Sequence, residues 1–585
     1  MLKLFRNLTR RDWFLAGCSV VFIVVQVWLD LKLPDYMSEI TLRVQTEGSA
    51  MRDILTAGGK MLACALGSLC AAVIVAIFAA RLASNFGASL RSKLFDRVQS
   101  FSLEEIGSFS TASLITRSTN DVTQVQMLIV MGFQVIVKAP IMAIWAITKI
   151  AGKSSQWTMS TGTAVVLLVA IVGACVYFTM PRFKRIQKLI DDLNRVTREN
   201  LTGLAVVRAY NAEDYQESKF DAANDDLTRT NLFTNRVMSI LFPTINIVMS
   251  GLTLSIFWIG AFLIDQAAMP DKFTLFSDMV VYTSYAMQIV MSVMMLIIIF
   301  IILPRASVSG RRILQVLEKK PSILDGGIRE SADGQKGEIE FRGVSFRYPD
   351  AEEYVLENIS FTAHRGETVA FIGSTGCGKS TVINLIPRFY DVTEGSVLVD
   401  GVDVREYSQA ALRDRIGYVS QRAVLFSGTV RSNVAYGDNG HAEVSEEDVV
   451  NAVYTAQAAD FVEKLEDGYD GFIAQGGANL SGGQKQRLSI ARAIARRPEI
   501  FIFDDSFSAL DYKTDRVLRE ALKRECRDAT KLIVAQRIGT IRDADRIVVL
   551  DDGHVAGIGT HTELMKNCEV YREIAYSQLS KEELD

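Results

Sequence analysis

The sequence lacks the features that mark several common classes of protein. Its 585 residues include only four histidines, and its seven cysteines show no CxxC spacing. This scatter argues against a zinc site or a disulfide framework. The net charge of −4 supplies no global positive field, so nucleic acid is not an expected partner. Charged residues make up 22% of the chain and hydrophobic residues 49%, which excludes a disordered chain and fits poorly with a wholly soluble one.

Six apolar runs in the first half of the chain are each close to the length of about 20 residues that crosses a bilayer. They lie at 13–29, 61–80, 133–149, 159–180, 240–264 and 276–303. Pro304 is expected to end the sixth run, before a basic helix with Arg311 and Arg312. Buried helices of a soluble protein are the weaker alternative for so many runs. The sequence predicts an all-α membrane domain of six spans.

The basic residues indicate how these spans are oriented. Several arginines and lysines precede the first run and fill the connection at 181–238, whereas the link at 150–158 has only Lys153. Under the positive-inside tendency, both chain ends are cytoplasmic. No small-residue cleavage site follows the first run, so it is expected to be a retained span. We therefore expect a multi-pass protein of the cell (plasma or inner) membrane.

The remaining segments predict how the chain divides into domains. The connections at about 81–132 and 181–238 alternate apolar and charged residues at helical spacing, which predicts helices that continue into the cytosol. A linker-like stretch at 331–337 precedes strands that alternate with helices, the α/β pattern. The expected domains are a membrane domain at 1–320, a linker at 321–336 and a cytoplasmic α/β domain at 337–585.

A glycine-rich loop follows the apolar strand expected at 367–372 and fits the pattern GxxxxGK[ST] between a strand and a helix. Its backbone N–H groups can surround phosphate oxygens, and its lysine can reach the β- and γ-phosphates. The Ser380 hydroxyl can ligate Mg²⁺. A chance glycine-rich turn is the weaker alternative. The expected nucleotide-binding residues are Gly373, Ser374, Thr375, Gly376, Cys377, Gly378, Lys379, Ser380 and Thr381.

Two further motifs point to phosphate chemistry. The apolar strand at 500–503 runs into Asp504 and Asp505, and Asp504 is expected on the Mg²⁺ side. A segment of small residues lies between the glycine-rich loop and the acidic strand end. It leaves N–H groups and a hydroxyl free at the start of a helix, which suits a second phosphate-binding site. Its residues are Leu480, Ser481, Gly482, Gly483 and Gln484.

These motifs, in this order after six spans, resemble ATP-binding cassette (ABC) exporter half-transporters of the B-family, type IV fold, over nearly the whole chain. The resemblance implies a membrane all-α six-helix domain with long cytoplasmic extensions, followed by an α/β P-loop NTPase domain that uses ATP and Mg²⁺. It implies that Tyr348 stacks on adenine, that Gln421 is the Q-loop residue and a Mg²⁺ ligand, and that Asp511 belongs to the D-loop. Segments 113–122 and 198–210 resemble the two coupling connections.

Two residues depart from the family pattern. Asp505 stands where the family has a glutamate that activates the attacking water. It is one methylene shorter, so its carboxylate lies about 1.5 Å back, and misplacement on that scale can lower a rate on the order of 100-fold. Gln536 stands where the family has a switch histidine, and its amide can donate a hydrogen bond but cannot carry a proton. The alternative is that Asp505 still acts slowly as the base.

In this family each nucleotide lies between two cassettes, so a homodimer of this chain would have two impaired sites. The resemblance therefore implies a heterodimer with a non-identical half-transporter, as in bacterial multidrug exporters with one degenerate site. The expected function is ATP-driven export of hydrophobic or amphipathic compounds. A lipid or peptide exporter or flippase, and an ATP-gated regulatory subunit with little turnover, remain open.

The sequence says less about the transported molecule. The sixth span contains methionines together with Tyr282, Tyr285 and Gln288, which suit either an apolar pocket or ordinary helix packing. Lys138 in the third span either snorkels at the inner interface or lines the cavity.

Overall fold

The computed structural model describes residues 2–6, 8–46, 50–151, 154–330, 336–438 and 443–578. Residues 331–335 of the expected linker, and His441, lie outside these residues. The chain divides into two compact units. The first comprises Met1–Gln99 and Thr111–Lys319, and the second comprises Ser100–Ser110 and Lys320–Asp585.

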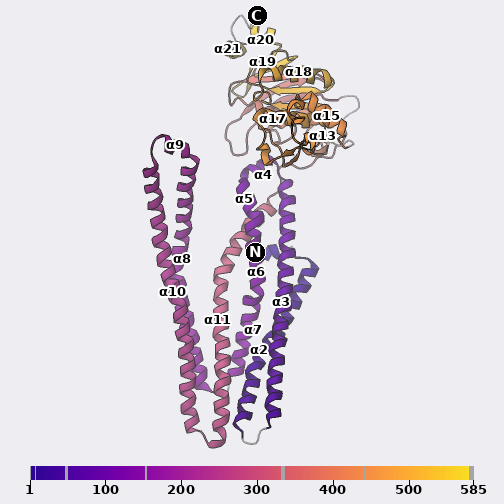
Figure 1. Ribbon diagram of the computed structural model, residues 1–585. Coiled ribbons are helices and arrows are strands. Elements are labelled where there is room, and N and C mark those ends of the chain that lie inside the picture. The colour runs from indigo at the N-terminus through magenta and orange to yellow at the C-terminus, as the bar shows by residue number, and fades with distance from the viewer. Residues whose placement is uncertain are drawn as a thin grey trace. The chain divides into compact units, whose positions relative to one another are not determined.

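The first unit is built from long helices (Figure 1). Six helical stretches of the described chain are long and apolar enough to cross a membrane, and each contains one of the predicted runs. The fold class expected from the sequence is thereby confirmed for this half. The helices are α1 (Leu2–Phe5), α2 (Arg10–Gln45), α3 (Met51–Gln99), α5 (Thr111–Thr116), α6 (Val122–Gly132), α7 (Ala139–Ile150), α8 (Ser155–Thr202), α9 (Leu204–Ala209), α10 (Glu213–Gln266) and α11 (Met269–Glu318).

The helix of the sixth span does not break at Pro304. Helix α11 continues through Pro304 to Glu318 as one element. A proline inside a helix removes one backbone hydrogen bond, but neighbouring packing compensates in membrane bundles. Here Ala306, Ile313 and Val316 are fully buried beyond the proline, so tertiary packing holds the helix together where the local sequence favours a break.

Two lysines of the third helical stretch, Lys138 and Lys149, are paired with aspartates of α2. The third span contains two π-helical segments, η1 (Arg117–Asp121) and η2 (Phe133–Lys138). Lys138, at the end of η2, lies 3.4 Å from Asp30 of α2. Lys149 lies 2.7 Å from Asp35, which also accepts a hydrogen bond of 2.5 Å from the Tyr285 hydroxyl. The position of Lys138 is explained by this ion pair, since charges within spans are stabilised by partners.

The aromatic residues of the sixth span pack against other helices. Tyr282 and Tyr285 are fully buried, and the Tyr282 ring lies 5.3 Å from the Trp157 ring of α8. Met291 and Met295 are exposed in the described chain. Helix packing therefore accounts for both tyrosines.

The second unit contains two main sheets. A four-stranded antiparallel sheet has the order β2-β1-β4-β5, and a six-stranded sheet has the order β12-β11-β3-β10-β9-β6, in which only β12 is antiparallel. A short pair, β7 with β8, completes the strands. The strands are β1 (Ile339–Phe346), β2 (Leu356–Ala363), β3 (Thr368–Gly373), β4 (Glu394–Val399), β5 (Val402–Asp403), β6 (Ile416–Val419), β7 (Gly428–Thr429), β8 (Phe472–Ile473), β9 (Ile500–Asp504), β10 (Thr530–Val534), β11 (Arg546–Asp551) and β12 (His554–Gly559).

Helices surround these sheets (Figure 1). Strands β9 and β10 are buried along their whole length, as expected for parallel strands covered on both faces. Their register places Val534 opposite both Phe371 of β3 and Asp504 of β9, so the carboxyl ends of three neighbouring strands meet at one edge. The helices are α4 (Leu103–Ser108), α12 (Lys379–Leu385), α13 (Gln409–Asp414), α14 (Val430–Val434), α15 (Glu446–Thr455), α16 (Ala459–Val462), α17 (Gly482–Ala495), α18 (Tyr512–Glu525), α19 (Ile538–Ile541), α20 (His561–Asn567) and α21 (Glu569–Gln578), with 3-10 turns η3 (Gly468–Asp470) and η4 (Gln475–Gly477).

Candidate nucleotide-binding site

The glycine-rich loop joins the carboxyl end of β3 to the start of α12. Gly378 has φ +95°, and a Cβ there would lie 2.6 Å from the Leu356 side chain. A Cβ on Gly373 would overlap the backbone oxygen of Leu550. The Cys377 thiol is buried in the hydrophobic core, where its sulfur lies 3.6 Å from Lys379 Nζ. The fold thus requires glycine where the loop turns and leaves the backbone N–H groups as the ligands for phosphate.

Lys379 holds its ammonium group over this loop. Its Nζ donates to the carbonyl oxygens of Gly373 at 2.9 Å and Ser374 at 2.6 Å. Charged oxygens accept hydrogen bonds from an ammonium group more strongly than neutral carbonyls. Phosphate oxygens at the loop would therefore compete for the same donors, which fits the predicted role of Lys379.

Ser380 and Asp504 form the side of the site that fits Mg²⁺. The Ser380 hydroxyl donates to Oδ1 of Asp504 at 2.8 Å. Burial raises the pKa of Asp504, and the bond from Ser380 opposes that shift. A hydroxyl and a carboxylate are suitable oxygen ligands for Mg²⁺, which usually binds one or two carboxylates together with substrate phosphates and water. In the described residues no cluster of three or more acidic, histidine or cysteine side chains could hold a metal alone.

Asp505 occupies the opposite side and is held by two amides. Its Oδ2 accepts from Gln536 Nε2 at 2.8 Å and from Gln421 Nε2 at 3.2 Å. Gln421, expected as a Mg²⁺ ligand, thus contacts Asp505 here. Three residues that follow β6, β9 and β10 meet at one carboxylate, and neither amide can accept a proton from water in the way a histidine or carboxylate can.

The backbone and burial of Asp505 are also unusual. Its φ is +46°, in the left-handed region, where aspartate is better tolerated than most residues. Its N–H donates to the Val534 carbonyl at 3.0 Å. Burial raises the pKa of the Asp505 carboxyl group, although hydrogen bonds from Gln421 and Ser508 oppose the shift. A raised pKa makes the carboxylate a stronger base.

The predicted adenine platform lies beside the loop. The Tyr348 hydroxyl is 3.1 Å from the Thr381 hydroxyl of α12. The Tyr348 ring packs edge-to-face against Phe346 and Tyr390, with ring centres 4.9 and 5.3 Å away. These contacts fix a half-buried ring at the site, and adenine stacking by Tyr348 stays a prediction.

The small-residue segment at 480–484, which we call the signature segment, lies at the N-terminus of helix α17. Ser481 caps α17, where its hydroxyl accepts from Gln484 N–H and Gln484 Oε1 accepts from Ser481 N–H at 2.8 Å. Leu480 is buried beneath it, and Gly482 and Gly483 open the helix. Within the part of the chain that the structure describes, no hydrogen bond or ion pair joins residues 480–484 to the loop at 373–381.

The segment expected to be the D-loop follows Asp505 in the chain and contacts it. The Ser508 hydroxyl donates to the Asp505 carbonyl at 2.8 Å. Asp511 caps α18 by accepting from Thr514 N–H at 3.0 Å, and this backbone hydrogen bond lowers the pKa of Asp511. The capping bond explains Asp511 structurally, and its role toward nucleotide stays a prediction.

Sequence reasoning missed one residue at this site. Gln578, at the end of α21, makes two hydrogen bonds to the segment that begins at Gln536. No motif surrounds Gln578, and the contact joins parts of the chain far apart in sequence, so no local pattern could have predicted it.

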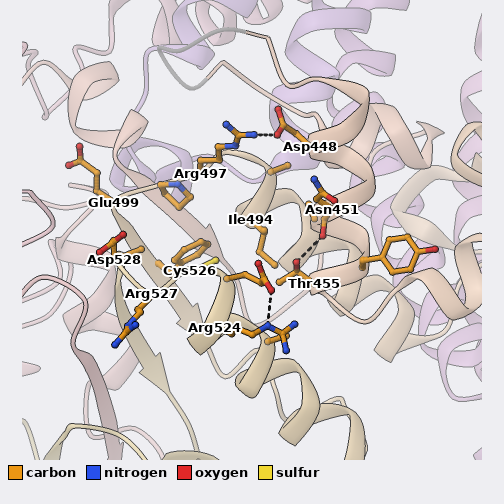
Figure 2. Close-up of a pocket in the computed structure, with 18 of the residues that line it drawn as sticks. Asp448, Asn451, Thr455, Ile494, Arg497, Glu499, Arg524, Cys526, Arg527 and Asp528 are labelled. Atoms are coloured by element: carbon orange, nitrogen blue, oxygen red, sulfur yellow. Dashed lines mark hydrogen bonds and ion pairs between the residues drawn. The ribbon is translucent and has the colours of Figure 1, made fainter.

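A separate hollow of about 980 Å³ lies in the second unit, shown in Figure 2. Its walls include Glu499 and Ala529, which precede β9 and β10, so it lies at the amino ends of these strands. None of the predicted nucleotide residues lines it. Ligands of parallel sheets bind at the carboxyl ends, and the Arg497 charge in the hollow is already paired with Asp448. The nucleotide motifs, and not this hollow, define the candidate site.

A P-loop domain with a signature helix, following six membrane-spanning helices, defines the class of ATP-powered membrane transporters. The family model "ABC transporter transmembrane region" matches residues 16–316, and the model "ABC transporter" matches residues 356–508. The chain belongs to the ABC transporter family. It is an exporter-type half-transporter with one membrane domain and one ATP-binding domain, an ATP-hydrolysing translocase by membership, and a multi-pass membrane protein.

Similar curated proteins and a similar solved structure agree with this assignment. An uncharacterized ABC transporter ATP-binding protein of Mycobacterium tuberculosis is 41% identical over 468 residues, 80% of this chain and 79% of that protein. An ATP-dependent lipid A-core flippase of Chromohalobacter salexigens is 34% identical, covering 73% of each chain. A bacterial Atm1-family ABC exporter solved with ATP bound matches with a TM-score of 0.80 and 23% identity, over 98% of this chain and 100% of that one, which shows the shared fold.

Proposed function

We propose that this chain is the half of an ABC exporter that binds ATP and hydrolyses it slowly, and that it works with a non-identical half-transporter. The observation that carries the proposal is Asp505, a short carboxylate held by the amides of Gln421 and Gln536 where hydrolysis needs a general base. The phosphate-binding parts of the site keep the full motif. Binding is retained in this proposal, and the step that activates water is weakened.

In this proposal, different residues of the chain bind phosphate, hold Mg²⁺ and act on water. The loop around Lys379 holds the β- and γ-phosphates, and Ser380 with Asp504 would hold Mg²⁺, which neutralises phosphate charge when bound. Asp505 lies too far back to orient water well, and a misplacement near 1 Å is enough to lower a rate on the order of 100-fold. Gln536 can donate a hydrogen bond to a γ-phosphate oxygen but supplies no positive charge.

Two features support a second half-transporter as partner. In the described chain no hydrogen bond or ion pair joins the signature segment, Leu480 to Gln484, to the phosphate loop at 373–381, so this segment is available to complete another site. The second cytoplasmic connection carries apolar side chains that face solvent in the described chain, including Leu201 and Tyr210, which lie on either side of helix α9 and are 66% and 79% exposed. Exposed apolar patches of this kind are typical of interaction surfaces. By contrast, α4 of the first connection belongs to the second unit of the same chain, where Glu105 accepts from Ser322 N–H.

The proposed cargo is a hydrophobic or amphipathic compound, exported from the cytoplasmic side, where the domain at 337–585 and both termini lie in this proposal. A multidrug-type range is our first candidate. A lipid is the second, because a relative that is 34% identical is a lipid A-core flippase. A regulatory subunit with little turnover is the remaining alternative.

The test is to purify the chain and reconstitute it alone and with a candidate partner half that co-purifies with it. We expect stable ATP binding and slow hydrolysis alone, and fast hydrolysis with vectorial transport into inverted vesicles in the mixture. Rapid hydrolysis by the chain alone would contradict the proposal. ATP binding by the mixture without cargo movement against a gradient would favour the regulatory alternative. A fluorescent phospholipid and an amphipathic dye, compared in the same vesicles, distinguish the two cargo classes.

A further inference from the structure

The last helix of the described chain reaches the nucleotide site through one side chain. Gln578 Nε2 donates to the backbone carbonyl of Gln536 at 2.7 Å, and Gln578 Oε1 accepts from the Ile538 N–H at 2.9 Å. Both functional groups of the amide are therefore used on one short segment. Ile538 is the first residue of α19, so Gln578 also satisfies a backbone donor that a helix start leaves unpaired.

Helix α21, which carries Gln578, is anchored by buried side chains. Its residues Tyr571 and Ala575 are fully buried in the hydrophobic core of the second unit. The Tyr571 hydroxyl lies 2.7 Å from His561 Nδ1, which ties α21 to α20. Gln578 itself lies at the exposed end of the helix, but its backbone position is set by this buried packing.

The segment between β10 and α19 is held from two sides. On one side, the Ala535 N–H donates to the Phe371 carbonyl of β3 at 3.2 Å. On the other side, Gln578 binds the backbone of Gln536 and Ile538. The Gln536 side chain projects from this clamped backbone and donates to Asp505 at 2.8 Å. A shift of the backbone at 536 moves the amide relative to Asp505.

We propose that Gln578 is a positioning residue for the nucleotide site: it fixes the backbone at 536–538 so that the Gln536 amide meets Asp505. The inference rests on the proposed function, in which Gln536 and Asp505 act on the γ-phosphate and water. Gln578 touches neither ATP nor water in this scheme and acts only through Gln536. The C-terminal helix thereby contributes to the rate of hydrolysis and to retention of ATP.

The experiment uses the full-length chain in nanodiscs, with protein in excess over labelled Mg-ATP, so that slow single-turnover hydrolysis and ATP dissociation are both measured. Gln578→Ala removes both hydrogen bonds. Gln578→Glu keeps the acceptor for Ile538 N–H and loses the donor, whereas Gln578→Lys keeps a donor and loses the acceptor. Ser577→Ala is the matched control, because the Ser577 hydroxyl bonds only to Ile574 within the same helix.

We expect Gln578→Ala to slow single-turnover hydrolysis and to speed ATP release, each about two- to tenfold, the range for one or two net hydrogen bonds. The Glu and Lys variants should fall between Ala and the unmodified chain, and Ser577→Ala should match the unmodified chain. The melting temperature should change little, since the buried part of α21 is untouched. A lower melting temperature with unchanged rates would mean a purely structural role and would overturn the inference.

Gln536→Ala separates the inference from the proposal beneath it. If Gln536→Ala changes the hydrolysis and release rates and Gln578→Ala does not, Gln578 is not a positioning residue while the proposed function stands. If neither Gln536→Ala nor Asp505→Asn changes any rate, these two side chains do not act on the nucleotide and the inference fails, whereas the proposed function itself is contradicted by rapid hydrolysis in the unmodified chain.

Discussion

The two sides of the candidate nucleotide site differ in how closely they keep the family pattern. On the phosphate side, the glycines, Lys379, Ser380 and Asp504 are all present, and Ser380 bonds Asp504 at 2.8 Å. On the water side, Asp505 and Gln536 replace glutamate and histidine and bond to each other at 2.8 Å. In the proposed function, the difference means that ATP binding is kept while hydrolysis is weakened, because different side chains would serve each step.

The largest effect is expected from lengthening the side chain on the water side. Asp505→Glu moves the carboxylate outward by one methylene, so single-turnover hydrolysis should rise on the order of 100-fold. The melting temperature of Asp505→Glu should be slightly lower, because glutamate is less suited than aspartate to the left-handed backbone at 505. Equal rates for Asp505→Glu and the unmodified chain would remove the contrast between the two sides.

The second largest effect is expected on ATP affinity, when Lys379 on the phosphate side is replaced. Lys379→Ala removes the ammonium group, and hydrogen bonds to charged groups are worth about 1.5–3 kcal/mol, so ATP affinity should fall about 10- to 100-fold. Equilibrium binding of a fluorescent ATP analogue measures the change. Lys464→Ala, an exposed lysine of the same unit, is the control. Unchanged affinity in Lys379→Ala would place the nucleotide elsewhere.

A smaller effect is expected from restoring the second family residue. Gln536→His supplies a side chain that can carry a proton near neutral pH, and a hydrolysis gain of about tenfold or less is the size of one hydrogen bond to a charged group. The gain should depend on pH and disappear where imidazole is neutral. A gain of equal size in Gln536→Ala would show that loss of the amide, and not the new imidazole, is responsible.

The smallest effect is expected on the melting temperature of the nucleotide-free protein, when the Asp505 carboxyl group is replaced. Burial raises the pKa of Asp505, so the folded protein binds this proton more tightly than the unfolded chain. The favourable contribution is complete below the ordinary aspartate pKa of about 3.9 and is lost as pH rises through the raised pKa. Asp505→Asn should therefore raise the melting temperature at pH 7.5 by about 1–3 °C, and the gain should shrink toward acid pH. A gain that grows on acidification would contradict the burial argument.

Local patterns were enough to predict much of this molecule. Length and apolarity predicted the six spans, and the spacing of glycines and Lys379 predicted a phosphate loop between a strand and a helix. Each of these features depends on residues close together in the chain.

Contacts between distant residues escaped sequence reasoning. Lys138 offered two local interpretations, and its partner Asp30 lies on another helix. Pro304 signals a helix end by local rules, yet packing on either side carries α11 through it. The bond from Gln421 to Asp505 joins residues far apart in the sequence, and Gln578 belongs to no motif. Tertiary packing decides these features, and no short segment encodes it.

The most direct test is the state of the nucleotide held by the unmodified chain. The chain alone is incubated with saturating Mg-ATP for many minutes, bound nucleotide is separated rapidly, and the proportions of ATP and ADP are measured. The account predicts nucleotide bound at the loop of Lys379 and recovered mainly as ATP. Rapid multiple turnover, with ADP as the main product and no further increase in Asp505→Glu, would contradict it.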